Sequence, residues 1–222
     1  MESKLILFQG DSITDTLRCK TNDHQGYGFV NMGYGYANLV AAHLGSAAPY
    51  QYRFLNRGIS GNRVVDLYAR IKADIINLRP DYLSILIGVN DVWHEYTAMN
   101  GVEAEKFELV YGLLIEELLT ALPDLKLMLL EPFVLPGSAT CSDDEHPNRW
   151  EFFRSETDLR RQAVKRLAHK YGVRFVPLQD LFDNVNADAP APGYWLADGV
   201  HPTPAGHELI KQAWLEAFER IK

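Results

Sequence analysis

The stretch that decides the fold is Lys4–Thr14, KLILFQGDSIT. It begins as a compact apolar run and ends in a Gly-Asp-Ser turn, a pattern typical of a buried strand followed by a loop. Open α/β sheets bind their ligands just beyond the carboxyl ends of the strands, which is where Ser12 would lie. Gly, Asp and Ser are also ordinary turn residues, so this motif alone only makes Ser12 a candidate nucleophile.

Outward from this strand, apolar strands and amphipathic helices alternate along the chain. Four more strands are expected at Tyr52–Asn56, Asp81–Ile87, Lys126–Leu130 and Val173–Leu178. Helices are expected at Tyr36–Leu44, Val64–Leu78, Glu103–Leu122, Trp150–Tyr171 and Pro204–Ile221. This alternation predicts an α/β fold, a five-stranded parallel sheet with helices on both faces. No repeat or linker interrupts it, so residues 1–222 are expected to form one domain.

The composition excludes several classes of partner. The chain has 222 residues, 47% of them hydrophobic, and a formal net charge of −7, which disfavours nucleic acid and anionic membranes as partners. No apolar run approaches the roughly 18 residues of a membrane span. The first residues show neither the basic segment nor the long apolar stretch of a secretory signal. We therefore expect a cytoplasmic protein.

Neither a metal nor a cofactor is expected. Cys19 and Cys141 fit no CxxC pattern and are expected to be free thiols. Residues 143–146, Asp-Asp-Glu-His, lie in a proline-bearing loop without a second spaced cluster and are expected to be solvated, as is His24. No Gly-x-Gly-x-x-Gly motif or P-loop follows a strand, which disfavours a flavin or nucleotide site.

Four polar loops carry the chemistry, and a parallel sheet would open them on one edge. They are Gly10–Ser12, Gly58, Gly88–Asp91 and Asp198–His201. A nucleophilic serine needs a base, best oriented by a carboxylate. Asp198 and His201 are three residues apart, so one tight turn can place the carboxylate against the imidazole. The ordinary pKa of histidine, about 6.5, suits a base near working pH.

The same loops offer donors for an oxyanion, which must be fixed in advance. Ser12 and Gly58 can provide backbone N–H groups, and Gly58 has no Cβ to block a close approach. Asn90 can add a side-chain amide. Each residue alone is more simply read as a turn former. Four such loops at successive strand ends are hard to produce by turn statistics and favour acyl transfer.

With these motifs in place, the sequence resembles the SGNH family, the GDSL-type esterases and lipases, over essentially its whole length. The resemblance is carried by four blocks in family order, Gly10–Thr14, Asn56–Asn62, Ile87–Asp91 and Asp198–Pro202. It implies a three-layer flavodoxin-like fold with Ser12 as nucleophile, His201 as base and Asp198 orienting it. It also implies Ser12, Gly58 and Asn90 as the oxyanion hole. The Gly-x-Ser-x-Gly elbow of α/β-hydrolases is absent from the sequence.

Within that family, Gly58–Asn62 and Asn90–Trp93 most resemble intracellular carbohydrate acetylesterases of the acetylxylan esterase type. That likeness implies removal of acetyl groups from small ester substrates such as acetylated xylo-oligosaccharides, without a cofactor, and possible homo-oligomers. One alternative is a lysophospholipase or thioesterase acting on longer acyl chains. Another is a catalytically idle flavodoxin-like binding protein, which would have no need for intact Ser12, Asp198 and His201.

Aromatic residues flank the expected cleft. Trp93 follows the Asn90 block, and Trp195 precedes Asp198. Aromatic faces suit sugar rings, although such residues also pack the rims of clefts. Trp93, Trp195 and Asp11, which is adjacent to the nucleophile, are therefore the candidate substrate-binding residues.

Overall fold

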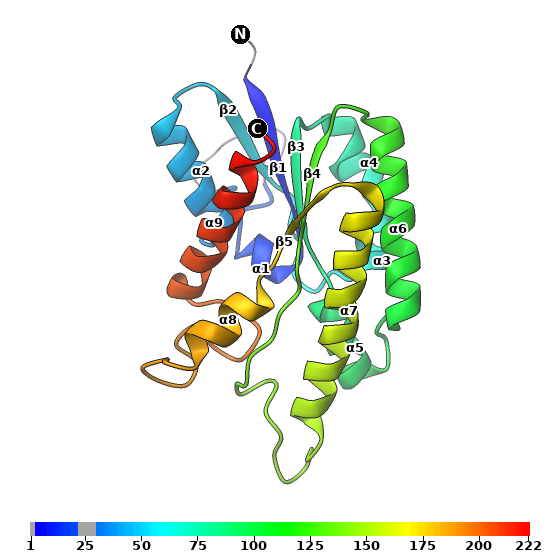
Figure 1. Ribbon diagram of the computed structural model, residues 1–222, viewed down its shortest axis with the longest axis vertical. Helices are drawn as coiled ribbons and strands as arrows, with labels where there is room; N and C mark the ends of the chain where they lie inside the picture. Colours follow the sequence, from blue (N-terminus) through cyan, green and yellow to red (C-terminus); the bar gives the residue numbers. More distant parts are fainter. Residues whose placement is uncertain (1–2, 22–29) are drawn as a thin grey trace.

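The computed structural model describes residues 3–21 and 30–222, so the expectation for His24 lies outside the described residues. Its centre is an all-parallel sheet in the order β2-β1-β3-β4-β5 (Figure 1). The strands are β1 (Lys4–Gly10), β2 (Tyr52–Asn56), β3 (Tyr82–Leu86), β4 (Lys126–Leu130) and β5 (Arg174–Val176). The predicted fold class is confirmed. Because strand order reverses between β1 and β3, the ligand-binding switch point of the sheet lies where β1 ends.

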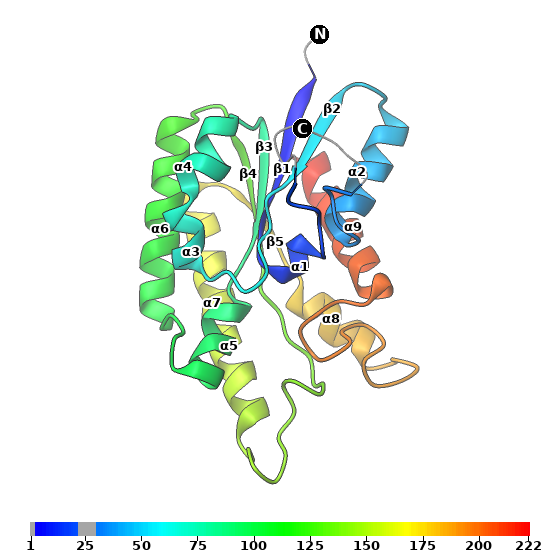
Figure 2. The same ribbon diagram turned by 180° about the vertical axis from the view of Figure 1, so that it is seen from behind.

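Helices cover both faces of the sheet (Figures 1 and 2). One face carries α2 (Tyr36–Ala47) and α9 (Pro204–Glu219). The other carries α3 (Val64–Ala69), α4 (Ile71–Asp74), the 3-10 turn η1 (Ile76–Leu78), α6 (Ala104–Ala121) and α7 (Arg149–Tyr171). Three helices lie towards the carboxyl edge of the sheet, α1 (Ser12–Asp15), α5 (Val89–Ala98) and α8 (Gln179–Asn186).

The strands read as continuous apolar runs because both of their faces are buried. In β1, Ile6 and Phe8 belong to the core under α2 and α9, whereas Leu7 belongs to the core under α6 and α7. All three side chains have no exposed surface. Burying a side chain of this size contributes about 1.5–3 kcal/mol, so β1 is anchored in both cores.

The structure shortens the expected strand 173–178 to Arg174–Val176, and it corrects two expected helices. The stripe at 64–78 is not one helix, because the backbone leaves helical geometry at Arg70 and Ile75. The Arg70 guanidinium instead donates to the carbonyl of Arg57 at 2.9 Å and to Gln9 at 2.7 Å. The spacing of apolar residues shows only which face of a segment is buried. A break caused by long-range hydrogen bonds does not change that spacing, so the sequence pattern could not reveal it. Secondly, the 36–44 helix continues through Gly45 to Ala47.

No helix within residues 3–21 and 30–222 combines the length and apolar composition that crossing a bilayer requires.

Candidate active site

Ser12 is the first residue of α1, directly after β1. Asp11 caps this helix, its Oδ1 accepting the N–H of Ile13 at 2.9 Å. The helix ends after one turn, where Thr16 adopts a left-handed conformation and its N–H donates to the Ser12 carbonyl. The strand end and the capped turn therefore fix the backbone of Ser12 at the switch point of the sheet.

The three predicted catalytic side chains come together in one chain of hydrogen bonds. Ser12 Oγ lies 3.0 Å from His201 Nε2, across 189 positions of sequence. On the other side of the ring, His201 Nδ1 lies 2.7 Å from Asp198 Oδ2. The second carboxylate oxygen of Asp198 accepts the backbone N–H groups of Val200 and His201 at 2.9 and 2.8 Å. Asp198 is thus held by its own turn.

The charge states of Asp198 and His201 are suited to taking a proton from Ser12. Burial disfavours the charged Asp198, but its hydrogen bonds from the His201 ring and from two backbone N–H groups outweigh burial and hold its pKa at about 2. The hydrogen bond to Asp198 raises the pKa of His201, with burial opposing it. An ionised Asp198 keeps the proton of neutral His201 on Nδ1, so Nε2 is left to accept the proton of Ser12.

The long loop between β4 and α7 supports the Asp198–His201 turn. Leu135 N–H donates to the Gly199 carbonyl, and Ala139 N–H to the Asp198 carbonyl, both at 2.9 Å. Gly137 lies so close beneath the turn that a Cβ there would stand 2.3 Å from the carbonyl carbon of Asp198. Any larger residue at 137 would displace the acid of the triad.

The three predicted oxyanion donors differ in whether their N–H groups already have an acceptor. Within the described part of the chain, the Ser12 N–H has no acceptor. Asn90, the second residue of α5, donates one amide hydrogen to the Asn62 carbonyl at 3.2 Å and has a second one available. The Gly58 N–H is already used, since it donates to Asn56 Oδ1 at 2.9 Å.

Asn56 is a structural residue of the site that the sequence did not single out. Its amide donates to the carbonyls of Thr14 and Met32 at 2.6 and 2.9 Å, while its oxygen accepts from Gly58. The buried end of β2 is thereby tied to α1. The available signal was a polar residue closing an apolar strand directly before the glycine block.

A cavity of about 550 Å³ opens beside Ser12 and His201. Several of the residues lining it were not predicted, namely Ile13, Thr16, Leu17, Tyr34, Ser60, Pro202, Pro204 and His207. For His207, the available signal was a second histidine six positions after His201, in the sequence HPTPAGH.

The three candidate substrate-binding residues occupy different surroundings. The ring of Trp93 lies 6.0 Å from that of His201, centroid to centroid, but Trp93 does not line the cavity beside Ser12. The indole N–H of Trp195 donates to the Val185 carbonyl at 3.0 Å, and Trp195 does not line the cavity beside Ser12. Asp11 is buried behind Ser12, and burial raises its pKa to about 7 against the opposing effects of the Ile13 N–H and His201.

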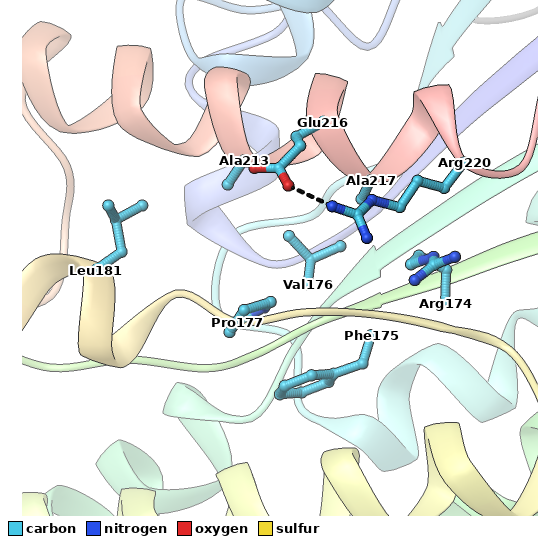
Figure 3. Close-up of a pocket in the computed structure, with 9 residues that line it drawn as sticks. All are labelled: Arg174, Phe175, Val176, Pro177, Leu181, Ala213, Glu216, Ala217 and Arg220. Carbon is cyan, nitrogen blue, oxygen red and sulfur yellow. Dashed lines mark hydrogen bonds and ion pairs between the residues drawn. The ribbon is translucent and has the colours of Figure 1, made fainter.

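A second cavity, of about 420 Å³, lies between β5, α8 and α9, away from these residues (Figure 3). Its lining has no serine, cysteine or histidine, and Glu216 pairs there with Arg220 at 2.8 Å. Across residues 3–21 and 30–222, no group of three or more His, Cys, Asp or Glu side chains is arranged to hold a metal ion. The cavity beside Ser12 is therefore where we place the chemistry.

Comparison with known proteins agrees with this geometry. Residues 8–209 match the GDSL-like Lipase/Acylhydrolase family. The chain is 35% identical to an acetylxylan esterase of Geobacillus stearothermophilus over 98% of this chain and 95% of the relative. Crystal structures of variants of an acetylxylan esterase from the same organism, with a serine, an aspartate or a histidine replaced by alanine, are described as catalytic mutants.

Solved structures resemble the whole chain. One described as a GDSL-like lipase from Parabacteroides merdae has a TM-score of 0.89 and 36% identity, covering 100% of this chain and 97% of that one. An acetyl-xylooligosaccharide esterase of G. stearothermophilus has a TM-score of 0.82 and 32% identity, covering 98% and 96%. This chain is a carboxylic ester hydrolase with a Ser-His-Asp triad, and it belongs to the GDSL-like lipase/acylhydrolase family.

Proposed function

We propose that this enzyme removes acetyl groups from carbohydrates such as acetylated xylo-oligosaccharides. The observation that carries the proposal is the 35% identity, over nearly the whole chain, to an enzyme that is named an acetylxylan esterase. The position of Trp93 beside His201 supports it, because an indole face suits a sugar ring. A cytoplasmic location and self-association remain predictions from the sequence.

In the first half of the reaction, Ser12 is the nucleophile and His201 the base. Ser12 Oγ attacks the ester carbonyl carbon while its proton passes to His201 Nε2, 3.0 Å away. Asp198 stabilises the imidazolium that forms, through the 2.7 Å hydrogen bond to Nδ1. The C–O bond to the alcohol then breaks, and the alcohol oxygen takes the proton from Nε2. An acetyl group remains on Ser12.

In the second half, water replaces the alcohol. His201 accepts a proton from the water, whose oxygen attacks the acetyl carbon, and that proton then passes to Ser12 Oγ as acetic acid leaves. In both halves the oxyanion needs donors in place beforehand. The Ser12 N–H and the second amide hydrogen of Asn90 are available to supply them, whereas the Gly58 N–H is held by Asn56 Oδ1.

A substrate panel tests this proposal. For one alcohol, kcat/KM is measured for acetyl, butyryl and octanoyl esters, and the acetyl ester is then compared with a mono-acetylated methyl xyloside. We expect a steep fall from acetyl to butyryl and a preference for the xyloside. Ser12→Ala protein serves as the blank, because it lacks the attacking oxygen. A rise towards octanoyl would replace the proposal with the lysophospholipase or thioesterase alternative.

A further inference from the structure

A second imidazole, that of His207, lines the same cavity as Ser12 and His201. It lies in the first turn of α9 and is only 6% exposed. Its Nδ1 accepts the backbone N–H of Tyr36 at 3.2 Å, and its ring stacks on that of Tyr36 at an angle of 22°. Gly35 leaves just enough room, since a Cβ there would stand 2.7 Å from Cε1 of the ring. The ring therefore has one position.

The same contacts fix its tautomer. Because Nδ1 accepts a hydrogen bond, the proton of the neutral ring lies on Nε2. Burial, with the charge of His201 adding to it, lowers the pKa of His207 to about 4, so the ring is neutral at working pH. Nε2 is not a buried atom, and within the described ranges it has no acceptor. His207 thus presents a lone N–H donor at the cavity.

The donor lines the same cavity as His201, which must protonate the leaving alcohol. The leaving oxygen receives its proton from His201 Nε2, so the alcohol part sits next to His201. His201, Pro202, Pro204 and His207 all line this cavity. Leu17 and Tyr34, both largely exposed, provide apolar surface on the same cavity. Apolar surface beside a fixed hydrogen-bond donor suits a ring that carries hydroxyls.

We propose that His207 is a substrate-binding residue that donates a hydrogen bond from Nε2 to a hydroxyl oxygen next to the scissile ester. The inference rests on the proposed carbohydrate function and gives it a specificity determinant. The matching ligand is a cyclic alcohol with a free hydroxyl on the carbon beside the acetylated one, as in a partly acetylated sugar.

The test uses two esters that differ by one hydroxyl, trans-2-hydroxycyclohexyl acetate and cyclohexyl acetate. In wild type, kcat/KM should favour the hydroxylated ester by about five- to tenfold, the effect of one hydrogen bond. In His207→Asn, the amide oxygen can still accept from Tyr36, but no donor reaches the cavity, so this ratio should fall to near one. In His207→Gln, the longer amide reaches as far as Nε2, and most of the ratio should return. His169→Asn, on exposed α7 surface, is the matched control.

A ratio that is the same in wild type and His207→Asn overturns the inference, as does an equal loss on both esters, which marks a purely structural role. Imidazole ¹⁵N spectra of Ser12→Ala protein give a readout that does not depend on the stability of the His207 variants. The Nε2 signal of His207 should shift with the hydroxylated ester and not with cyclohexyl acetate. If wild type discriminated between the two cyclohexyl esters but did not hydrolyse acetylated xylosides, the proposed function would be refuted and the role of His207 would stand.

Discussion

At the residue scale, the acid of the triad controls when the base is available. Asp198 accepts from the His201 ring and from two backbone N–H groups, and the ring hydrogen bond raises the pKa of His201. Only neutral His201 can take the proton of Ser12. Activity should therefore rise with pH through the pKa of His201, and the rise should lie above the ordinary value of about 6.5.

Asp198→Asn tests this arrangement. Without the carboxylate, the imidazolium loses its partner, so the midpoint of the rise should move to lower pH. The limiting kcat should fall by about 10³- to 10⁴-fold, because the tautomer and orientation of the ring are no longer fixed. The measurement is kcat/KM on an acetate ester from about pH 5 to about pH 9. An unchanged midpoint would show that Asp198 does not set the pKa of the base.

Asn90→Ala tests the proposed oxyanion donor. Its amide is oriented by the Asn62 carbonyl at 3.2 Å and acts on charge that appears only in the transition state. We expect kcat to fall by about 10²- to 10³-fold, with a smaller change in KM. Steady-state kinetics on a single acetate ester separates the two. Near-normal kcat with a raised KM would make Asn90 a substrate-binding residue.

At the element scale, the one-turn helix α1 depends on its neighbours, because a helix this short is not stable alone. Asp11 caps its start, and Asn56 at the end of β2 donates to the Thr14 carbonyl. Gly58 packs against it so closely that a Cβ would stand 2.4 Å from the backbone nitrogen of Asp15. The position of Ser12 is therefore set by β1 and β2 together.

Gly58→Ala should displace α1, since the new methyl group meets backbone and not a flexible side chain. We expect kcat/KM to fall by about 10²-fold and the free energy of unfolding by about 1–3 kcal/mol. Gly45→Ala is the matched control. Gly45 lies within α2, and a Cβ there would have its nearest neighbour, the Phe54 ring, at 4.0 Å, so a gain of about 0.5–1 kcal/mol is expected. Activity assays and urea unfolding check both variants, and wild-type kcat/KM in Gly58→Ala would contradict the close packing.

At the scale of the whole molecule, two buried carboxyl groups near the sheet couple stability to pH. Asp91 has no exposed surface, and both of its oxygens accept from the Val64 N–H, at 3.1 and 3.3 Å. Burial raises its pKa to about 8, with the Val64 N–H and Arg160 opposing, and that of Asp11 to about 7. The folded protein therefore keeps protons that the unfolded chain releases above an ordinary pKa of about 4.

It follows that these two groups should lower the free energy of unfolding as the pH rises from about 4 to about 8, by at most about 1.4 kcal/mol per pH unit and group. His207, whose pKa is lowered to about 4, opposes one of them up to about pH 6.5. Asp91→Asn removes one of these groups while keeping an acceptor for Val64, so the fall should become shallower. Urea unfolding at about pH 5 and about pH 8 measures the difference. Asp144→Asn, on an exposed loop, should leave the slope as in wild type. An unchanged slope in Asp91→Asn would mean that Asp91 is already ionised at pH 5.

The sequence by itself determined the alternation of strands and helices, and hence the parallel sheet with covered faces. It also determined the Asp198–His201 turn, since both depend on near neighbours in the chain. Periodicity and turn chemistry are local properties of the chain. The continuous apolar runs of β1 and β3 indicate that both faces of each strand are buried. One domain over 1–222 stays a prediction.

Only the tertiary structure decided which distant groups meet. Ser12 and His201 are 189 positions apart, and their 3.0 Å contact needs β1 and the chain before α9 to end at one sheet edge. Nothing local shows that Asn56 donates to the Thr14 carbonyl, 42 positions away, or that Trp195 bonds to Val185. Nor does local sequence show that His207 faces the cavity. A hydrogen bond between remote segments depends on how whole elements pack, and residue pattern records only which face of each element is buried.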